Sequence, residues 1–136
     1  MINLEWVQHR AGIHHMFPSS IDITDADGNL LVTSYAVRRP DGNWSLMLVN
    51  RDATNPHTVR VVFQDSKSKR NAPFSGPVTF VSFGTEQYVW INDGPNSHPD
   101  PDHAPVAARL QGPPSTFTLP KSSITVLRGR VAGLED

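Results

Sequence analysis

The amino-acid sequence predicts an all-β fold, an antiparallel β-sandwich of about seven or eight strands. Twelve prolines and nine glycines are spread along the 136 residues and interrupt every long helical pattern. Between them lie short segments rich in β-branched and aromatic residues, which is typical of strands. A chain of this length fits one domain, and we expect the sandwich to cover residues 30–131, followed by a short tail at residues 132–136.

The clearest element is a hairpin over residues 30–51. Its two strands, residues 30–38 and 44–51, are rich in apolar residues, and Asp41-Gly42 between them supplies the positive φ angles of a tight turn. Both alternating faces of the second strand are apolar, so we expect this strand to be central and covered on both sides. Tyr35 and Trp44 lie within these strands and are expected in the core.

Further strands are expected after this hairpin, because short apolar segments recur between turn residues. They cover residues 57–63, 76–84 with a continuation at 86–91, 115–119 and 122–131. Where apolar and polar residues alternate, one face of the strand is predicted to be buried. The residues predicted to form a common core are Leu46, Leu48, Val59, Val61, Val78, Phe80, Ile124 and Val126.

Composition and charge exclude several classes of protein. Twelve basic and thirteen acidic residues give a net charge of −1 without a basic stripe, so a nucleic-acid partner is not expected. No apolar run approaches the roughly 20 residues that cross a bilayer, so no membrane partner is expected either. The absence of cysteine excludes disulfides and thiolate metal ligands. Residues 1–6 lack the basic start and apolar stretch of a signal peptide.

Histidines and aspartates offer two weak candidates for metal binding. His9, His14 and His15 cluster near the N-terminus, and imidazoles suit copper, zinc and nickel. Adjacent side chains on a strand point to opposite sides, so surface or interface roles are favoured for these histidines. Residues 22–29 resemble a calcium loop but lack its first oxygen ligand, and a turn explains them better. No cofactor is therefore predicted.

Tyr88 and Trp90 form the best candidate for a carbohydrate-binding platform. On a strand, residues two apart share a face, and aromatic rings stack on the apolar faces of sugars. The polar, proline-rich residues 92–114 that follow predict a long loop beside these rings. The competing interpretation, which we weigh more heavily, is that both rings pack in the core or over a sheet edge.

Three stretches of the chain carry a family resemblance, namely residues 31–52, 74–79 and 117–129. The first contains a strand, a turn and a strand that ends in Val49-Asn50, and the last runs from Leu119-Pro120 to Leu127. In this order they resemble the C-terminal β-sandwich of glycoside hydrolases whose catalytic module is a (β/α)8 barrel, of the xylosidase and arabinofuranosidase kind. The likeness covers most of the chain, roughly residues 30–130.

The resemblance implies an accessory domain and not the hydrolase itself. Glycosidic hydrolysis requires two carboxylates flanking the scissile bond, which in such enzymes lie on barrel strands. The three glutamates, Glu5, Glu86 and Glu135, form no evident pair, so no catalytic residue is predicted and the chain is not expected to be an enzyme. The implied partner is the (β/α)8 catalytic domain, with plant polysaccharide as a further contact. Residues 1–29 would be a linker or extension that packs on that partner.

The resemblance also implies a bacterial, secreted enzyme of polysaccharide degradation, located outside the cell or in the periplasm. Since this chain has no signal peptide of its own, we expect it to be a fragment of a longer enzyme. Two alternatives stay open: an independent carbohydrate-binding module that uses Tyr88 and Trp90, and a small copper or cupin-like enzyme that uses the histidines. A docking domain predicts an exposed apolar patch, a binding module exposed aromatic rings, and a metalloenzyme three converging imidazoles.

Overall fold

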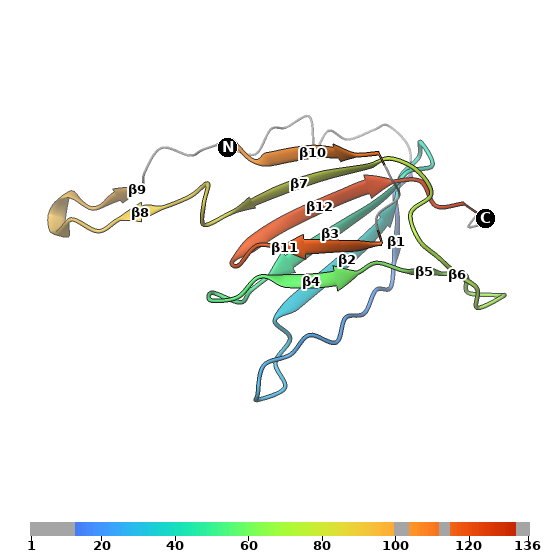
Figure 1. Cartoon of the computed structure of the whole chain (residues 1–136), viewed down its shortest axis with the longest axis horizontal. Coiled ribbons are helices and arrows are strands. Elements are labelled where there is room, and N and C mark those ends of the chain that lie inside the picture. Colours follow the sequence, from blue (N-terminus) through green and yellow to red (C-terminus); the bar gives the residue numbers. More distant parts are fainter. Residues whose placement is uncertain (1–12, 100–103, 112–114, 133–136) are drawn as a thin grey trace.

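The computed structural model describes residues 13–99, 104–111 and 115–132, and it confirms an antiparallel all-β fold (Figure 1). Its main sheet has six strands in the order β1-β2-β3-β12-β7-β10. These strands are β1 (His15–Phe17), β2 (Val32–Arg38), β3 (Trp44–Asn50), β12 (Ser123–Gly129), β7 (Val78–Gly84) and β10 (Val106–Leu110). Each strand is antiparallel to its neighbours, so the sheet contains no parallel pair. β1, β2 and β3 are neighbours in chain order, whereas β12 lies between β3 and β7.

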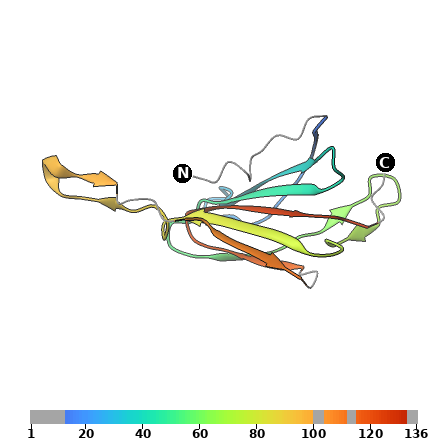
Figure 2. The same ribbon diagram turned by 90° about the horizontal axis from the view of Figure 1, so that it is seen from above.

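A second, smaller layer covers one face of the main sheet (Figures 1 and 2). It consists of β4 (His57–Arg60) paired with β11 (Thr116–Leu119), and of β5 (Phe63–Gln64) paired with β6 (Asn71–Ala72). The remaining pair, β8 (Trp90–Ile91) with β9 (His98–Pro99), belongs to neither layer. In the described residues, the eight strands of three residues or more match the expected number, and four two-residue strands are additional.

The core lies between the two layers. Alternate residues of β3 (Trp44, Leu46, Leu48) face Val59, Val61 and Phe63 of the second layer. A chain of tilted and edge-on rings runs through this core, from Phe17 through Trp44, Phe63 and Phe74 to Phe117, with centroid separations of 4.8 to 6.2 Å. Aromatic pairs at such distances add stabilisation beyond their buried area.

The predicted core is correct in five of its eight members and wrong at β12. Leu46, Leu48, Val59, Val61 and Val78 are buried, and Phe80 packs against the core while partly exposed. Ile124 is 40% exposed and Val126 is only partly buried, whereas Thr125 and Leu127 are fully buried. The prediction chose the wrong face of this strand, because both faces carry apolar residues and alternation alone cannot tell them apart.

The prediction for β3 is half correct. The strand is central, between β2 and β12, but the strands of the described residues cover only one of its two faces. Met47 on its second face is 38% exposed, and Tyr35 beside it on β2 is 46% exposed instead of lying in the core. Trp44, on the opposite face, is buried as expected.

The described part of residues 1–29 belongs partly to the sandwich. β1 pairs with β2 at the edge of the main sheet, and Ile21 and Ile23 pack against the core. The sandwich therefore begins before residue 30, inside the segment expected to be a linker. Residues 1–12 lie outside the described residues, as does the predicted tail beyond Ala132. None of the described helices is long and apolar enough to span a membrane.

Candidate functional site: an open sheet face and a projecting arm

One face of the main sheet points away from the second layer, and we call it the outer face. Its apolar residues come from four neighbouring strands and lie in register across the sheet. They are Tyr35 and Val37 on β2, Met47 and Val49 on β3, Ile124 and Val126 on β12, and Val81 and Phe83 on β7. No strand in the described part of the chain covers this face. Tyr35, Met47 and Ile124 are each exposed over more than a third of their surface, whereas Val81 is buried and the other four are partly buried.

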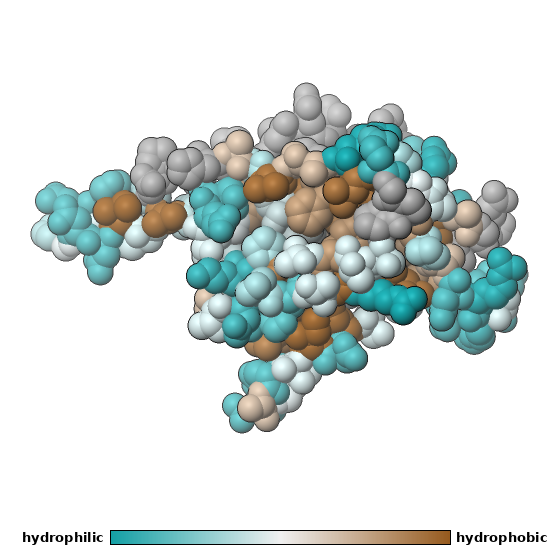
Figure 3. Space-filling view, viewed as in Figure 1, coloured by the Kyte–Doolittle hydropathy of each residue, from teal (hydrophilic) through white to brown (hydrophobic). Residues whose placement is uncertain are grey.

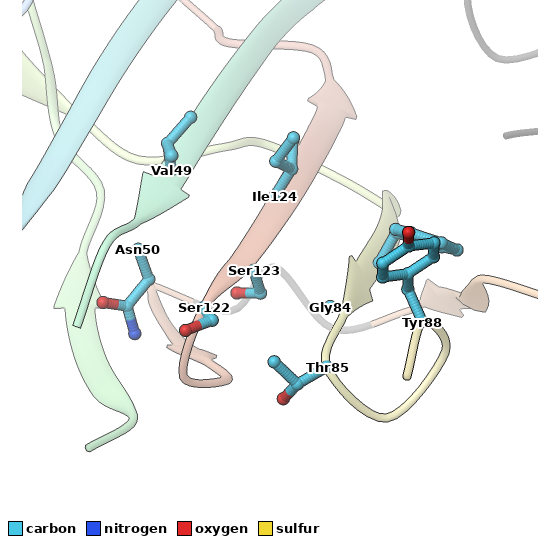
Figure 4. A pocket seen from close by; sticks show the side chains of 9 residues that line it. Val49, Asn50, Gly84, Thr85, Tyr88, Ser122, Ser123 and Ile124 are labelled. Atoms are coloured by element: carbon cyan, nitrogen blue, oxygen red, sulfur yellow. The ribbon is translucent and has the colours of Figure 1, made fainter. Parts of the chain in front are cut away.

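A hollow of about 270 Å³ marks the end of the outer face (Figure 4). Val49, Phe83 and Ile124 are the apolar side chains that line it from the sheet, and Tyr88 lines it beside the end of β7. The outer face therefore continues from the sheet onto the segment that follows β7. That segment, residues 85–99, projects from the sandwich, and we call it the arm (Figures 1 and 2).

The root of the arm is held in a defined turn. The backbone N–H of Gly84 donates to Oε1 of Gln87 at 2.7 Å, and the N–H groups of Gln87 and Tyr88 donate to the Gly84 carbonyl at 2.9 and 3.0 Å. A Cβ atom at Gly84 would lie 3.0 Å from Cβ of Ser123, so a side chain there would crowd β12. The turn and the close approach together fix the direction in which the arm leaves the sheet.

Exposed apolar side chains continue along the arm (Figure 3). Val89 and Ile91 are exposed, and the indole of Trp90 is 55% exposed. At the tip, a turn closes through the short 3-10 helix η2 (Gly94–Asn96), where the Asp93 N–H and the Gly94 carbonyl both bond the hydroxyl of Ser97. An isolated pair of short strands with so little apolar burial is at most marginally stable in water.

Tyr88 and Trp90 both belong to the arm, but only Trp90 lies on a strand. Residues 85–87 form a turn instead of the expected strand continuation, and Tyr88 precedes β8. The Tyr88 ring is 47% exposed, so both rings are accessible and neither is packed in the core. Carbohydrate binding by these rings stays a prediction, as part of the following loop (residues 100–103 and 112–114) lies outside the described residues.

The histidine alternative finds no geometric support in the described residues. His14 and His15 are exposed, with His15 on β1 at the sheet edge, while His9 lies outside the described residues. In the part of the chain that the structure describes, no three histidine, aspartate or glutamate side chains come together as a possible metal site. Three converging imidazoles would be required for the metalloenzyme alternative.

The segment at residues 22–29 is a hydrogen-bonded turn, as expected. Oδ1 of Asp25 accepts the N–H groups of Asp27 and Asn29, both at 2.9 Å, and Gly28 has a φ of +83°. The hydrogen bonds from Asn29, ahead of that from Asp27, lower the pKa of the Asp25 carboxyl. The turn closes between Thr24 and Leu30, which form an isolated bridge.

Asn50 links the first and the last of the three stretches that carry the family resemblance, and the sequence analysis noted it only as the end of a strand. Its side chain is 1% exposed, and its Nδ2 donates to the carbonyls of Leu119 and Pro120 at 3.2 and 2.9 Å. Its Oδ1 accepts the N–H of Asp52 at 3.0 Å. The Val-Asn end of β3 and the Leu-Pro turn before β12 therefore meet in space, and their role is structural.

Asp52 organises the turn that follows Asn50. Oδ1 of Asp52 accepts the N–H of Thr54 at 2.9 Å and that of Asn55 at 3.1 Å, and its Oδ2 contacts Nε2 of His57 at 2.8 Å. These contacts, the Thr54 N–H first and His57 second, hold the pKa of the Asp52 carboxyl well below its usual range. Asp52 and His57 therefore form a structural pair that closes the β3–β4 connection.

Comparison with known proteins gives only distant likenesses. The chain matches no protein-family model, and no curated protein matches it. Among solved structures, it is similar to the bifunctional glucanase-xylanase CelM2 from a metagenome library (14% identity, TM-score 0.44, 75% of this chain and 16% of that one). It is also similar to a GH51 arabinofuranosidase from Xanthomonas axonopodis pv. citri (21% identity, TM-score 0.45, 85% of this chain and 21% of that one).

A third structure differs in length from these enzymes. It is a protein of unknown function from Acinetobacter sp. ADP1 (DUF1255), with 14% identity and a TM-score of 0.42 over 86% of this chain and 93% of that one. The chain thus spans about a fifth of the length of the two hydrolases and nearly all of this third protein. All three TM-scores lie below 0.5, so we assign neither a family nor an activity to the chain from them.

Proposed function

We propose that this chain is a non-catalytic accessory β-sandwich of a carbohydrate-active enzyme, which docks on a (β/α)8 catalytic module through the outer face. The observation that carries the proposal is the exposure of Tyr35, Met47 and Ile124 on a sheet face that no described strand covers. Soluble monomers rarely leave large contiguous apolar patches open, and such patches mark interaction sites.

The class of partner comes from the sequence resemblance and not from the sheet itself. The stretches at residues 31–52 and 117–129 resemble the sandwich that follows a glycoside hydrolase barrel. Asn50 and Leu119, which belong to these stretches, shape the fold behind the outer face. A partner of this kind would place the domain outside the cell or in the periplasm, as part of a secreted enzyme.

Contact with polysaccharide is a second candidate function, favoured by the exposure of Tyr88 and Trp90 on the arm. Two accessible rings beside a catalytic cleft could stack on a xylan- or cellulose-type chain. With little else to hold the glycan, we expect dissociation constants in the millimolar range, about −4 kcal/mol. Affinity electrophoresis tests this idea: retardation of the native protein that is lost in Trp90→Ala supports it, and equal retardation of both proteins counts against it.

Docking is tested with the (β/α)8 hydrolase module encoded in the same reading frame or beside this chain in its genome. The proposal expects the module to keep its activity longer at elevated temperature when the native chain is added. Met47→Asp places a charge in the outer face and should abolish this protection. Lys67→Asp changes an exposed residue of the β5–β6 turn and should leave the protection intact. Protection that Met47→Asp does not reduce would refute docking through the outer face.

A further inference from the structure

A second pocket lies on the other side of the main sheet from the outer face, at the root of the arm. Phe80 and Ser82 of β7 and Val106 of β10 form one wall, and all three point toward the second layer. Val106 is nevertheless 49% exposed, because the second layer does not cover this end of the sheet. The pocket has a volume of about 360 Å³, at the lower end of the range for small-molecule sites, about 300–1,000 Å³.

Three loops complete this root pocket. Thr54 and Pro56 come from the β3–β4 connection, Pro120 and Lys121 from the turn before β12, and residues 85–87 from the arm root. The apolar part of the lining is therefore a phenyl ring with valine and proline surfaces, and the polar part carries hydroxyl, carboxamide, carboxylate and ammonium groups. The apolar side chains above β7 and β10 are visible between the more polar groups in Figure 3.

Two charges of opposite sign line the pocket without being paired. Among the described residues, neither Glu86 nor Lys121 makes an ion pair or hydrogen bond, with each other or with any other group. The carboxylate can accept hydrogen bonds and the ammonium can donate them. Gln87 is already oriented, because its Oε1 accepts the Gly84 N–H at 2.7 Å. The lining thus offers acceptors and donors beside apolar surface, with no net charge.

We propose that the root pocket binds one or two units of an uncharged sugar. A sugar ring has hydroxyls that both donate and accept, and apolar C–H faces that pack on an aromatic ring. An anion such as phosphate would meet Glu86, and a cation would meet Lys121, so an uncharged polyhydroxyl ligand fits both groups at once. The volume suits a chain end or short oligosaccharide and not an extended polymer. This site is independent of docking, because Ser82 and Phe83 point to opposite faces of β7.

The test is titration of the isotopically labelled chain with D-xylose, L-arabinose, D-glucose and xylobiose, followed by NMR. We expect saturable shifts at the backbone amides of residues 80–87, 106 and 121, with at least one sugar binding in the millimolar range. Glu86→Ala and Lys121→Met should each weaken this binding about five- to tenfold, since each removes a charged hydrogen-bonding group. A well-dispersed spectrum shows that a variant is folded.

A matched control separates the pocket from the rest of the surface. Lys67→Met removes an exposed lysine of the β5–β6 turn, at the other end of the sandwich from the arm, and should leave sugar binding unchanged. The proposal is overturned if no sugar gives a saturable shift up to about 100 mM, well above a millimolar constant. It is also overturned if Glu86→Ala and Lys121→Met bind as the native chain does, or if glycine betaine or inorganic phosphate binds more tightly than every sugar.

Discussion

The side chain of Asn50 joins the β3–β4 connection to the turn before β12. It is fully buried, and it bonds backbone groups on both sides, from Asn55 and Asp52 in one connection to Leu119 and Pro120 in the other. A buried polar side chain is tolerated only when its groups are satisfied, and here four backbone groups share one carboxamide. The same buried arrangement explains why an apolar strand ends in an asparagine at this position.

Replacement of Asn50 by Ala should lower the free energy of unfolding by about 2–3 kcal/mol, because it leaves buried carbonyls and one N–H without partners. Urea denaturation followed by circular dichroism measures this loss. Asn71→Ala, on the exposed β6 strand, is the matched control and should change stability by no more than about 0.5 kcal/mol. Equal effects of the two substitutions would contradict the role assigned to Asn50.

Asp52 predicts a pH dependence whose sign follows from its lowered pKa. A carboxyl with a pKa lower in the folded than in the unfolded chain stabilises the fold fully above its unfolded pKa, about 3.9, and loses that contribution as the pH falls below it. Native protein should therefore be more stable than Asp52→Asn at pH 6, and the gap should close toward pH 2. Thermal unfolding across this pH range measures the gap. Asp27→Asn, at an exposed turn residue, serves as the control; a gap that widens in acid would refute the assignment.

At the scale of elements, β3 shows how differently the two faces of one strand are used. Leu48 is 3% exposed between the layers, whereas its neighbour Met47 lies on the outer face. The two side chains are similar in size, so substituting each by Ala compares burial directly.

Leu48→Ala should cost about 2–5 kcal/mol of unfolding free energy, the usual range for a buried leucine. Met47→Ala should cost less than about 1 kcal/mol in the isolated chain, since its side chain is already in contact with water. Chemical denaturation of both variants provides the comparison. If Met47→Ala were as destabilising as Leu48→Ala, the outer face would be part of the core and not an open surface.

Elements were predictable where local chemistry decides them. The hairpin of β2 and β3 follows from alternation and from Asp41-Gly42, where Gly42 has a φ of +83°. The burial of β12 was not predictable, because Ile124, Val126 and Leu127 are all apolar and only the uncovered outer face distinguishes them. Residues 86–91 have the composition of a strand, yet the bond between Gln87 and Gly84 makes their first part a turn.

The candidate site could be predicted only in part, because alternation along a strand does not tell which of its faces is covered. Tyr88 and Trp90 were predicted as a platform from their spacing on a strand, and that role stays a prediction. Both residues are exposed, but Tyr88 precedes β8 and does not lie on a strand. The outer face and the root pocket depend on which side of each strand the second layer covers, and that is a property of long-range packing. Glu86 and Lys121, 35 positions apart in the sequence, come to one pocket through two separate turns.

The whole molecule combines a closed core with an open apolar face and a projecting arm (Figure 2). In the described part of the chain, the second layer packs on only one side of the main sheet, and Tyr35, Met47 and Ile124 are exposed on the other side. The outer face and the arm meet at Tyr88, which lines the hollow shown in Figure 4. A convex partner could therefore contact the sheet and the arm at once.

The isolated chain should release no sugar from xylan, arabinan or aryl glycosides, with or without divalent metal. Glu86 is the one glutamate in the described residues, and hydrolysis requires a pair of carboxylates about 5–10 Å apart around the bond. Reducing-sugar and chromogenic assays measure release. Turnover that survives repurification and disappears in Glu86→Gln would contradict an accessory role, and oxidised products formed only with copper and a reductant would favour the histidine alternative.

Sedimentation velocity of the chain mixed with the accompanying (β/α)8 module tests the use of the outer face most directly. The native chain should form a one-to-one complex, and Met47→Asp and Ile124→Asp should each weaken it at least tenfold while remaining folded by circular dichroism, because a charge buried in an apolar interface is costly. Lys67→Asp should bind as the native chain does. Absence of a complex with the native chain, or a complex that tolerates both outer-face substitutions, would contradict docking through this face.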